Sequence, residues 1–168
     1  MFELDTERLR IVALDVENYG LFLNEHGQML RKLGVKVTTE KLDEDFREMF
    51  LESYELALKD EENYMWYTNW QIILKSENLI IGGLCFKGCP DTNGYVEIGY
   101  GMDPNYQNKG YMTETIKGVA NWALTQESVK GVIAETDKGN IPSQKVLIKN
   151  KMEMYKETED CYWWIIKH

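Results

Sequence analysis

Residues that cross-link a chain, bind metals or interrupt helices are scarce in this sequence. Its 168 residues include three cysteines, three prolines and two histidines. The cysteines Cys85, Cys89 and Cys161 are odd in number, so they cannot all pair with one another, and we expect free thiols in a reducing compartment. The pair Cys85-x-x-x-Cys89 lacks a second ligand pair and any nearby histidine, so we expect no metal site. With only His26 and His168 available, a Ser-His-Asp triad is not expected either.

Long apolar runs and an excess of basic residues are also missing. No stretch approaches the length of an apolar membrane span, and the N-terminal MFELDTERLR lacks the apolar core of a signal peptide. We therefore expect a cytoplasmic protein with no membrane partner. The net charge of −9 argues against nucleic acid as a partner, because phosphate binding needs a basic face. The charge is compatible with a cationic amine or basic peptide as substrate, although acidity also serves solubility alone.

The apolar residues that are present predict a single mixed α/β domain over residues 1–168. Helical periodicity follows Asp15, which can cap a helix that ends by Gly34, and continues in three further helices at 39–60, 110–126 and 140–149. Strand-like runs occupy residues 9–13, 66–75, 78–86, 95–102, 131–136, 152–158 and 161–167. The predicted order is β-α-α-β-β-β-α-β-α-β-β, without repeats or linkers.

The most informative stretch runs from the strand at 95–102 into the helix that starts near residue 110. The turn between them reads QNKGYM at residues 107–112. The first turn of a helix exposes N–H groups without internal partners, and the helix dipole favours anions there. Gly110 lets the backbone approach an anion closely because it has no Cβ. The stretch therefore predicts a phosphate cradle, with an ordinary turn as the alternative. Neither a Walker P-loop nor a G-x-G-x-x-G motif opens a helix here.

Several short motifs, in the same order, resemble those of the GNAT N-acetyltransferases. Residues 107–110 resemble the acyl-CoA turn Q/R-x-x-G-x-G/A of that family, and EIGY at 97–100 and GYMTE at 110–114 resemble its flanks. NIPS at 140–143 resembles the N-x-x-S helix start, and TERLRI at 6–11 resembles the TERLxL opening of the branch that acetylates ribosomal-protein N-termini. The family usually has Gly or Ala where Met112 stands, and Gly where Lys151 stands. The resemblance implies the GNAT fold, a mixed central sheet flanked by helices.

The resemblance also implies acetyl-CoA as the co-substrate. The backbone of 98–102 is expected to pair with the pantetheine arm like an added strand, and the turn at 107–112 is expected to hold the pyrophosphate. Asn140 is expected to cap its helix and, by resemblance, to bond the pantetheine. The predicted cofactor-binding residues are Ile98, Gly99, Tyr100, Gly101, Met102, Gln107, Asn108, Lys109, Gly110, Tyr111, Met112, Asn140 and Ser143.

Two residues are candidates for the proton transfers of acetyl transfer. Glu97 lies in an apolar strand and is the candidate base; its alternative is a solvated carboxylate or a partner for a lysine. Ser143 is the candidate acid for the departing thiolate, as proposed in the resembled branch; its alternative is an ordinary first-turn residue. Many family members place a tyrosine acid where this chain has Leu147. Tyr155 is expected on the next strand and is not a candidate.

The predicted activity is acetyl transfer from acetyl-CoA to a primary amine by direct attack in a ternary complex. The acceptor is expected to be a peptide N-terminus, a polyamine or another small molecule. In the resembled family the first two helices form a wall of the acceptor site, which makes residues 30–39 a candidate mobile rim. Homodimers are common in that branch, so a homodimer is left open. A non-catalytic acyl-CoA-binding regulatory module on the same fold is the alternative.

Overall fold

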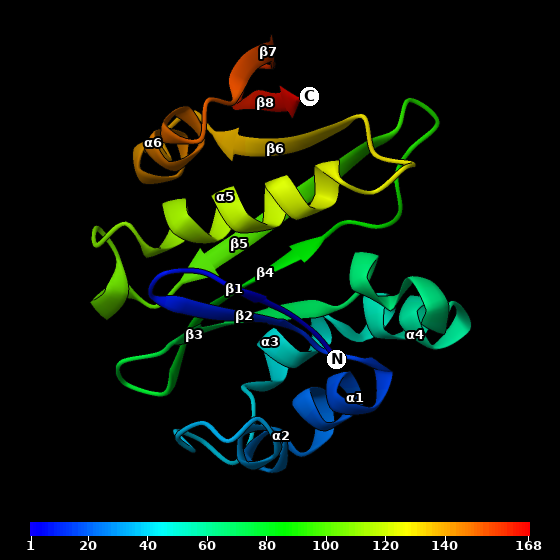
Figure 1. Cartoon of the computed structure of the whole chain (residues 1–168), viewed down its shortest axis with the longest axis vertical. Coiled ribbons are helices and arrows are strands. Elements are labelled where there is room, and N and C mark those ends of the chain that lie inside the picture. The colour runs from blue at the N-terminus through cyan, green and yellow to red at the C-terminus, as the bar shows by residue number, and fades with distance from the viewer.

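A computed structural model describes residues 1–168 and contains one eight-stranded sheet, in the order β1-β2-β3-β4-β5-β6-β8-β7 (Figure 1). The strands are β1 (Phe2–Asp5), β2 (Leu9–Ala13), β3 (Asn69–Leu74), β4 (Leu79–Phe86), β5 (Tyr95–Met102), β6 (Gly131–Asp137), β7 (Glu153–Glu157) and β8 (Cys161–Lys167). Neighbouring strands are antiparallel except β5 and β6, which run parallel. The predicted mixed sheet flanked by helices is confirmed.

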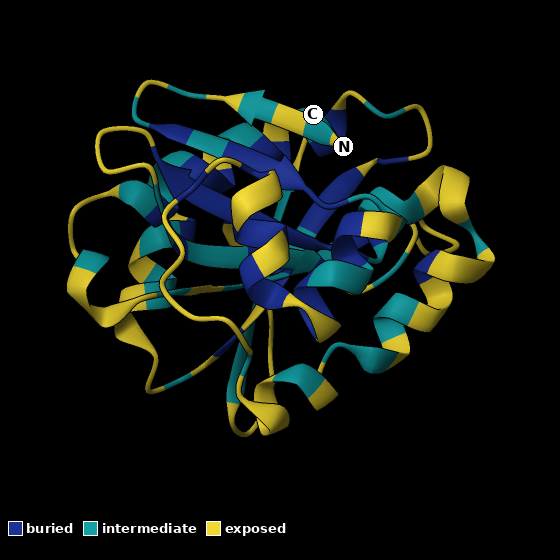
Figure 2. Ribbon diagram, turned by 90° about the horizontal axis from the view of Figure 1, so that it is seen from below, coloured by how far each residue is buried: buried dark blue, intermediate teal, exposed yellow.

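Helices cover both faces of this sheet. The helices are α1 (Val16–Asn24), α2 (His26–Lys32), α3 (Glu44–Glu48), α4 (Leu51–Lys59), α5 (Tyr111–Leu124) and α6 (Ile141–Lys149), with short 3-10 turns at Glu61–Trp66 and Pro104–Tyr106. Side chains of β2 alternate between two cores, because Ile11 packs in the cluster that contains α5 and Val12 packs in the cluster that contains α1 and α2. Figure 2 shows buried strands in the middle and helices with exposed outer faces.

Helix α5 forms as its sequence pattern predicts. The predicted apolar face is fully inside the larger core: Met112, Ile116, Val119, Ala120 and Ala123 are all buried. Truncating a fully buried side chain such as Ile116 to Ala typically destabilises a protein by about 2–5 kcal/mol, so this face anchors the helix on the sheet. The burial of Met112 explains how a long side chain is accommodated here, because it extends into the core.

The main differences from the sequence prediction lie in the first half of the chain. An additional strand, β1, pairs antiparallel with β2. The helix expected after Asp15 is interrupted at Glu25, whose φ of −141° and ψ of 57° are not helical. The helix expected at 39–60 is two short helices separated around Phe50, with φ of −109°. The strand expected at 66–75 begins only at Asn69, because a 3-10 turn occupies Glu61–Trp66.

Lys151 stands in the left-handed region with a φ of 60°, immediately after Asn150, the C-cap of α6. Its N–H donates to the carbonyl of Ile148 at 2.9 Å, and the N–H of Met152 donates to that of Leu147 at 3.1 Å. These bonds close the helix end in the way a glycine commonly does, and a side chain in this conformation costs about 1 kcal/mol. The departure at Lys151 therefore changes the residue but not the turn. No helix is both long and apolar enough to cross a bilayer.

Candidate active site

The sheet opens between its two parallel strands. The β5–β6 register consists of Tyr95–Gly131, Val96–Val132 and Glu97–Ile133, although β5 continues to Met102 and β6 to Asp137. The other edge of β5 stays paired with β4 as far as Met102. Beyond Glu97, the edge of β5 that faces β6 therefore has no strand partner. An extended ligand with amide groups can add to such an edge.

A run of free donors lies at the mouth of this opening. The backbone N–H groups from Asn108 to Thr113 make no hydrogen bond within the protein. Asn108 and Gly110 both have positive φ, 61° and 82°, and Gly110 directly precedes α5. Left-handed residues in a turn and the first turn of a helix aim successive N–H groups at one region, which suits a phosphate. The turn thus supplies the free donors that the cradle prediction requires, and phosphate binding there stays a prediction.

Side chains of the turn also have defined places. The Gln107 amide donates to the carbonyl of Met102 at 3.1 Å, which ties the turn to the end of β5. The Lys109 ammonium lies over the Tyr106 ring, 5.0 Å from its centroid. Gln107 thus supports the turn through its side chain.

The strand opening and the donor run border one cavity of about 330 Å³. This volume lies within the range of small-molecule sites, ~300–1,000 Å³. Most of the predicted cofactor-binding residues line it: Tyr100, Gly101, Met102, Gln107, Asn108, Gly110, Tyr111, Met112, Asn140 and Ser143. Ile98, Gly99 and Lys109 do not line it; Ile98 has its side chain in the core, so only its backbone is available to a ligand.

Two hydroxyl groups meet inside this cavity. The Oγ of Ser143, on α6, lies 2.7 Å from the Oη of Tyr100, on β5. Asn140 caps α6 as predicted, accepting from the Ser143 N–H at 3.2 Å, and thereby fixes the start of the helix. Burial raises the pKa of Tyr100 above its ordinary value, although the hydrogen bond with Ser143 lowers it in part. The phenol is therefore neutral near pH 7 and able to donate a proton.

The side chain of Tyr100 was missed by the sequence prediction, which assigned only its backbone a role. The signal was the chain's alternation: Tyr100 shares a face with Ile98, whereas Glu97 faces the opposite side. Leu147 is fully buried in the core, so that position offers no hydroxyl. Tyr155 lies on β7, the next strand, as predicted.

Glu97 lies on the opposite face of β5, paired with Lys87. The Lys87 ammonium is an ion-pair partner of Glu97 Oε1, an atom shielded from solvent. Burial alone would lower the pKa of Lys87, but its hydrogen bond and charge contact with Glu97 raise it overall. The lysine partner considered as an alternative from sequence is therefore real. The candidate base and the hydroxyl pair lie on opposite faces of one strand, with the opening beside them.

Further carboxylates share the face of Glu97. Ile133 is in register with Glu97, and Glu135 and Asp137 follow it at two-residue spacing on β6, both exposed. Burial and the carboxylates of Glu135 and Asp137 raise the pKa of the Cys161 thiol to about 11. Carboxylates therefore outnumber cations among the residues named on this side of the opening, and their negative charge favours the approach of a cation.

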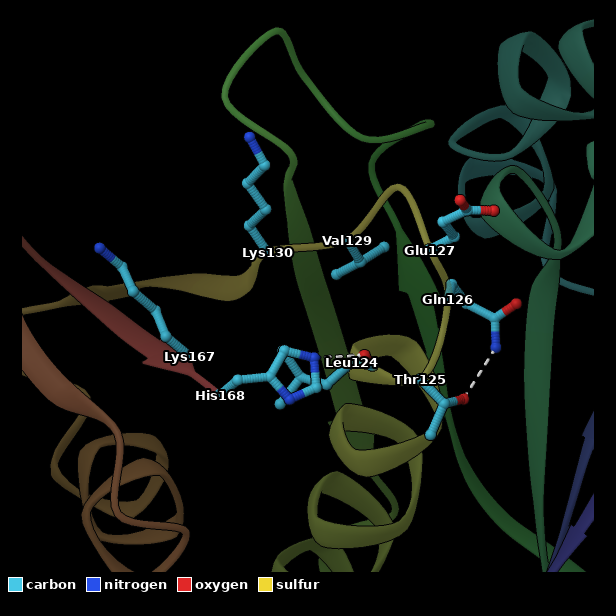
Figure 3. A pocket seen from close by; sticks show the side chains of 8 residues that line it. All are labelled: Leu124, Thr125, Gln126, Glu127, Val129, Lys130, Lys167 and His168. Carbon is cyan, nitrogen blue, oxygen red and sulfur yellow. Dashed lines mark hydrogen bonds between the residues drawn. The ribbon is translucent and has the colours of Figure 1, made fainter.

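A second hollow, of about 640 Å³, lies at the far end of α5 (Figure 3). It is lined by Leu124, Thr125, Gln126, Glu127, Val129, Lys130, Lys167 and His168. His168 Nε2 lies 2.6 Å from the Leu124 carbonyl oxygen, which closes one side. None of the predicted site residues borders this hollow, and it is larger than the cavity beside Ser143 but has no run of free donors. The chemistry is therefore assigned to the cavity at the strand opening.

The donor run and the unpaired strand edge suit an acyl carrier with a long amide-bearing arm and a phosphate end. Fold and site thus define an acyl-CoA-dependent transferase. A family model described as "Acetyltransferase (GNAT) domain" matches residues 8–153. The chain belongs to the GNAT acetyltransferase family and is an acetyl-CoA-dependent N-acetyltransferase.

Known proteins similar to this chain agree with that assignment. The uncharacterized N-acetyltransferase YjdG of Bacillus subtilis is 30% identical over 165 residues, covering 98% of each chain. The structure of the ribosomal-protein-S5-alanine acetyltransferase from Vibrio fischeri superimposes with a TM-score of 0.72 at 16% identity, covering 99% of this chain and 97% of that one. RimL, a ribosomal L7/L12 α-N-protein acetyltransferase in complex with coenzyme A, has a TM-score of 0.70 at 15% identity, covering 99% and 98%. At such identities these structures support the fold alone.

Proposed function

We propose that this enzyme transfers the acetyl group of acetyl-CoA to a primary amine by direct attack in a ternary complex. The observation that carries the proposal is the opening beyond the Glu97–Ile133 pair, with free N–H donors at its mouth. The unpaired edge of 98–102 holds the pantetheine arm, and the donors of 108–113 hold the pyrophosphate. Asn140 and Ser143 border the same cavity from α6.

Two proton transfers accompany the reaction. The amine nitrogen bonds to the carbonyl carbon, the carbon–sulfur bond breaks, and acetyl-CoA supplies the activated thioester. Glu97, the ion-pair partner of Lys87, takes the proton that the amine must lose, directly or through water. The Tyr100–Ser143 pair donates a proton or hydrogen bond to the departing sulfur. The two steps occur on opposite faces of β5.

We propose a peptide N-terminus or a small amine as acceptor. The carboxylates of Glu97, Glu135 and Asp137 favour a cationic group on the acceptor side of the strand opening. Within this class, the TERLRI segment at residues 6–11, which resembles the opening of the branch that acetylates ribosomal-protein N-termini, favours a peptide N-terminus.

A thiol-release assay with acetyl-CoA tests the proposal. N-terminal peptides and polyamines are offered side by side, and CoA binding is measured in parallel by calorimetry. We expect CoA to bind and free thiol to form only when an amine is present. Binding of CoA without thiol release from any amine would instead identify a non-catalytic acyl-CoA-binding module.

A further inference from the structure

The motif near the N-terminus packs against the start of α5. The Thr6 hydroxyl donates to Glu114 Oε1 at 2.6 Å, and the Arg8 backbone N–H donates to the same oxygen at 2.8 Å. The Arg8 Nε donates to Glu114 Oε2 at 2.7 Å. Glu114 lies on the first turn of α5, so the segment before β2 is held to the helix that follows the phosphate cradle. Neither the fold prediction nor the proposed reaction uses these contacts.

The same guanidinium also reaches the cradle. Arg8 Nη1 donates to the carbonyl oxygen of Lys109 at 3.0 Å. Its guanidinium carbon lies 4.5 Å from the centroid of the Tyr111 ring. A Cβ added at Gly110 would lie 3.4 Å from Arg8 Nη2. Arg8 therefore contacts Lys109 and Tyr111, on either side of Gly110, in the turn that bears the free N–H groups.

Peptide geometry gives these contacts a consequence. The carbonyl of Lys109 and the N–H of Gly110 belong to one planar trans peptide, so they point in opposite directions. An arginine that holds the carbonyl on one side fixes the N–H on the other side. Glu114 in turn holds the guanidinium in place, because its carboxylate accepts from Arg8 Nε and so restrains rotation of the Arg8 side chain.

We propose that Arg8 is a positioning residue of the phosphate cradle: from behind the turn, it orients the N–H donors that bind the pyrophosphate. This inference rests on the proposed function, because it assumes acetyl-CoA as the ligand. Removing the Arg8 side chain is expected to weaken ligand binding more than it weakens folding. The side chain of Arg8 is 41% exposed, and ion pairs with such an exposed member contribute little to folding.

The test compares three ligands on the intact protein. CoA, 3′-dephospho-CoA and pantetheine are titrated against wild type, Arg8→Ala and Arg8→Lys by calorimetry, with NMR for the weaker pantetheine. Losing the orientation of a cradle of this kind lowers affinity about tenfold or more for both phosphate-bearing ligands. Pantetheine, which has no pyrophosphate, keeps its affinity. Arg8→Lys gives at most partial recovery, because one ammonium cannot span Glu114 and the Lys109 carbonyl together.

Arg10→Lys is the matched control, because Arg10 bonds the Leu33 carbonyl at 2.8 Å, away from the cradle. It is expected to leave all three affinities unchanged. Loss of affinity for CoA alone, with 3′-dephospho-CoA unaffected, would replace positioning by a direct contact with the 3′-phosphate. An equal loss for pantetheine would show general damage to the fold. Failure of wild type to bind CoA would overturn the proposed function itself, a result distinct from either.

Discussion

Removing the hydroxyl of Tyr100 is the most direct test of the proton donor. Tyr100→Phe keeps the ring but deletes the 2.7 Å contact with Ser143. An intramolecular hydrogen bond contributes about 1 kcal/mol to stability, so we expect the melting temperature to fall by about 2–4 °C. Loss of one donor to a developing negative charge lowers the chemical rate by about 10²-fold. A rate effect much larger than the stability effect is therefore expected.

The rate must be measured where chemistry limits turnover, by single-turnover thiol release at saturating acetyl-CoA. Ser143→Ala and the double variant complete a cycle with Tyr100→Phe. If the hydroxyls act as one unit, the double variant is little slower than the slower single variant, whereas independent effects multiply. CoA affinity should stay nearly the same in all three proteins. Tyr162→Phe, which removes a hydroxyl on β8 outside the cavity, is the control. Wild-type single-turnover rates in both single variants would refute the assignment.

Three further results are expected. Gly110→Asp places a carboxylate in the cradle and should weaken CoA binding strongly. The protein should stay folded, because the nearest atom to the added Cβ, Arg8 Nη2, lies 3.4 Å away. Calorimetry against the uncharged Gly110→Asn shows whether charge or backbone strain is responsible, and unchanged affinity would contradict the cradle. Glu97→Gln should lower kcat/KM strongly at neutral pH with CoA affinity kept, and recover in part at higher pH; a pH–rate profile identical to wild type would make Glu97 a purely structural partner of Lys87. Burial alone would raise the pKa of Glu114, but its hydrogen bonds from Thr6 and Arg8 lower it. The carboxylate therefore stabilises the fold at neutral pH, and this contribution is lost as the pH falls from the ordinary glutamate pKa of 4.5 through the lowered pKa of Glu114. The difference in melting temperature between wild type and Glu114→Gln should therefore shrink on acidification, and a constant difference would contradict the linkage.

Local patterns predicted what local physics decides. The apolar face of α5 and the Asn140 cap depend on residues a few positions apart, and both are found as expected. The breaks themselves fall on Glu25 and Phe50, which are neither proline nor glycine, so the helical periodicity of the sequence continues through them. Strand β1 was missed because its pairing with β2, rather than its own four residues, makes it a strand.

The parts of the site that could not be predicted are contacts across the fold. The Tyr100–Ser143 pair joins residues 43 positions apart, and the Arg8–Glu114 pair joins residues 106 apart. Nothing in the spacing of either pair indicates contact. Only the parallel β5–β6 arrangement and the placement of β2 beside α5 bring them together. The sequence left open whether Glu97 is a solvated carboxylate or the partner of a lysine. The pairing of β4 with β5 places Lys87 beside Glu97 and makes it that partner.

The strand opening also bears on how this protein avoids aggregation. Unpaired strand edges attract other chains, and proteins usually blunt them with short length and charge. The two outer strands of the sheet follow that rule. Strand β1 has only four residues, FELD, and strand β7 has five, EMYKE, all of which are exposed in β7. The edge of β5 beyond Glu97 has no such charges, being IGYGM. It lies between two strands of its own sheet, in a wedge that closes at the Glu97–Ile133 pair, and so it is not an outer edge of the sheet. The unpaired backbone edge that is offered to the ligand is therefore internal to the sheet, whereas the two edges that face other molecules are short and carry charged residues.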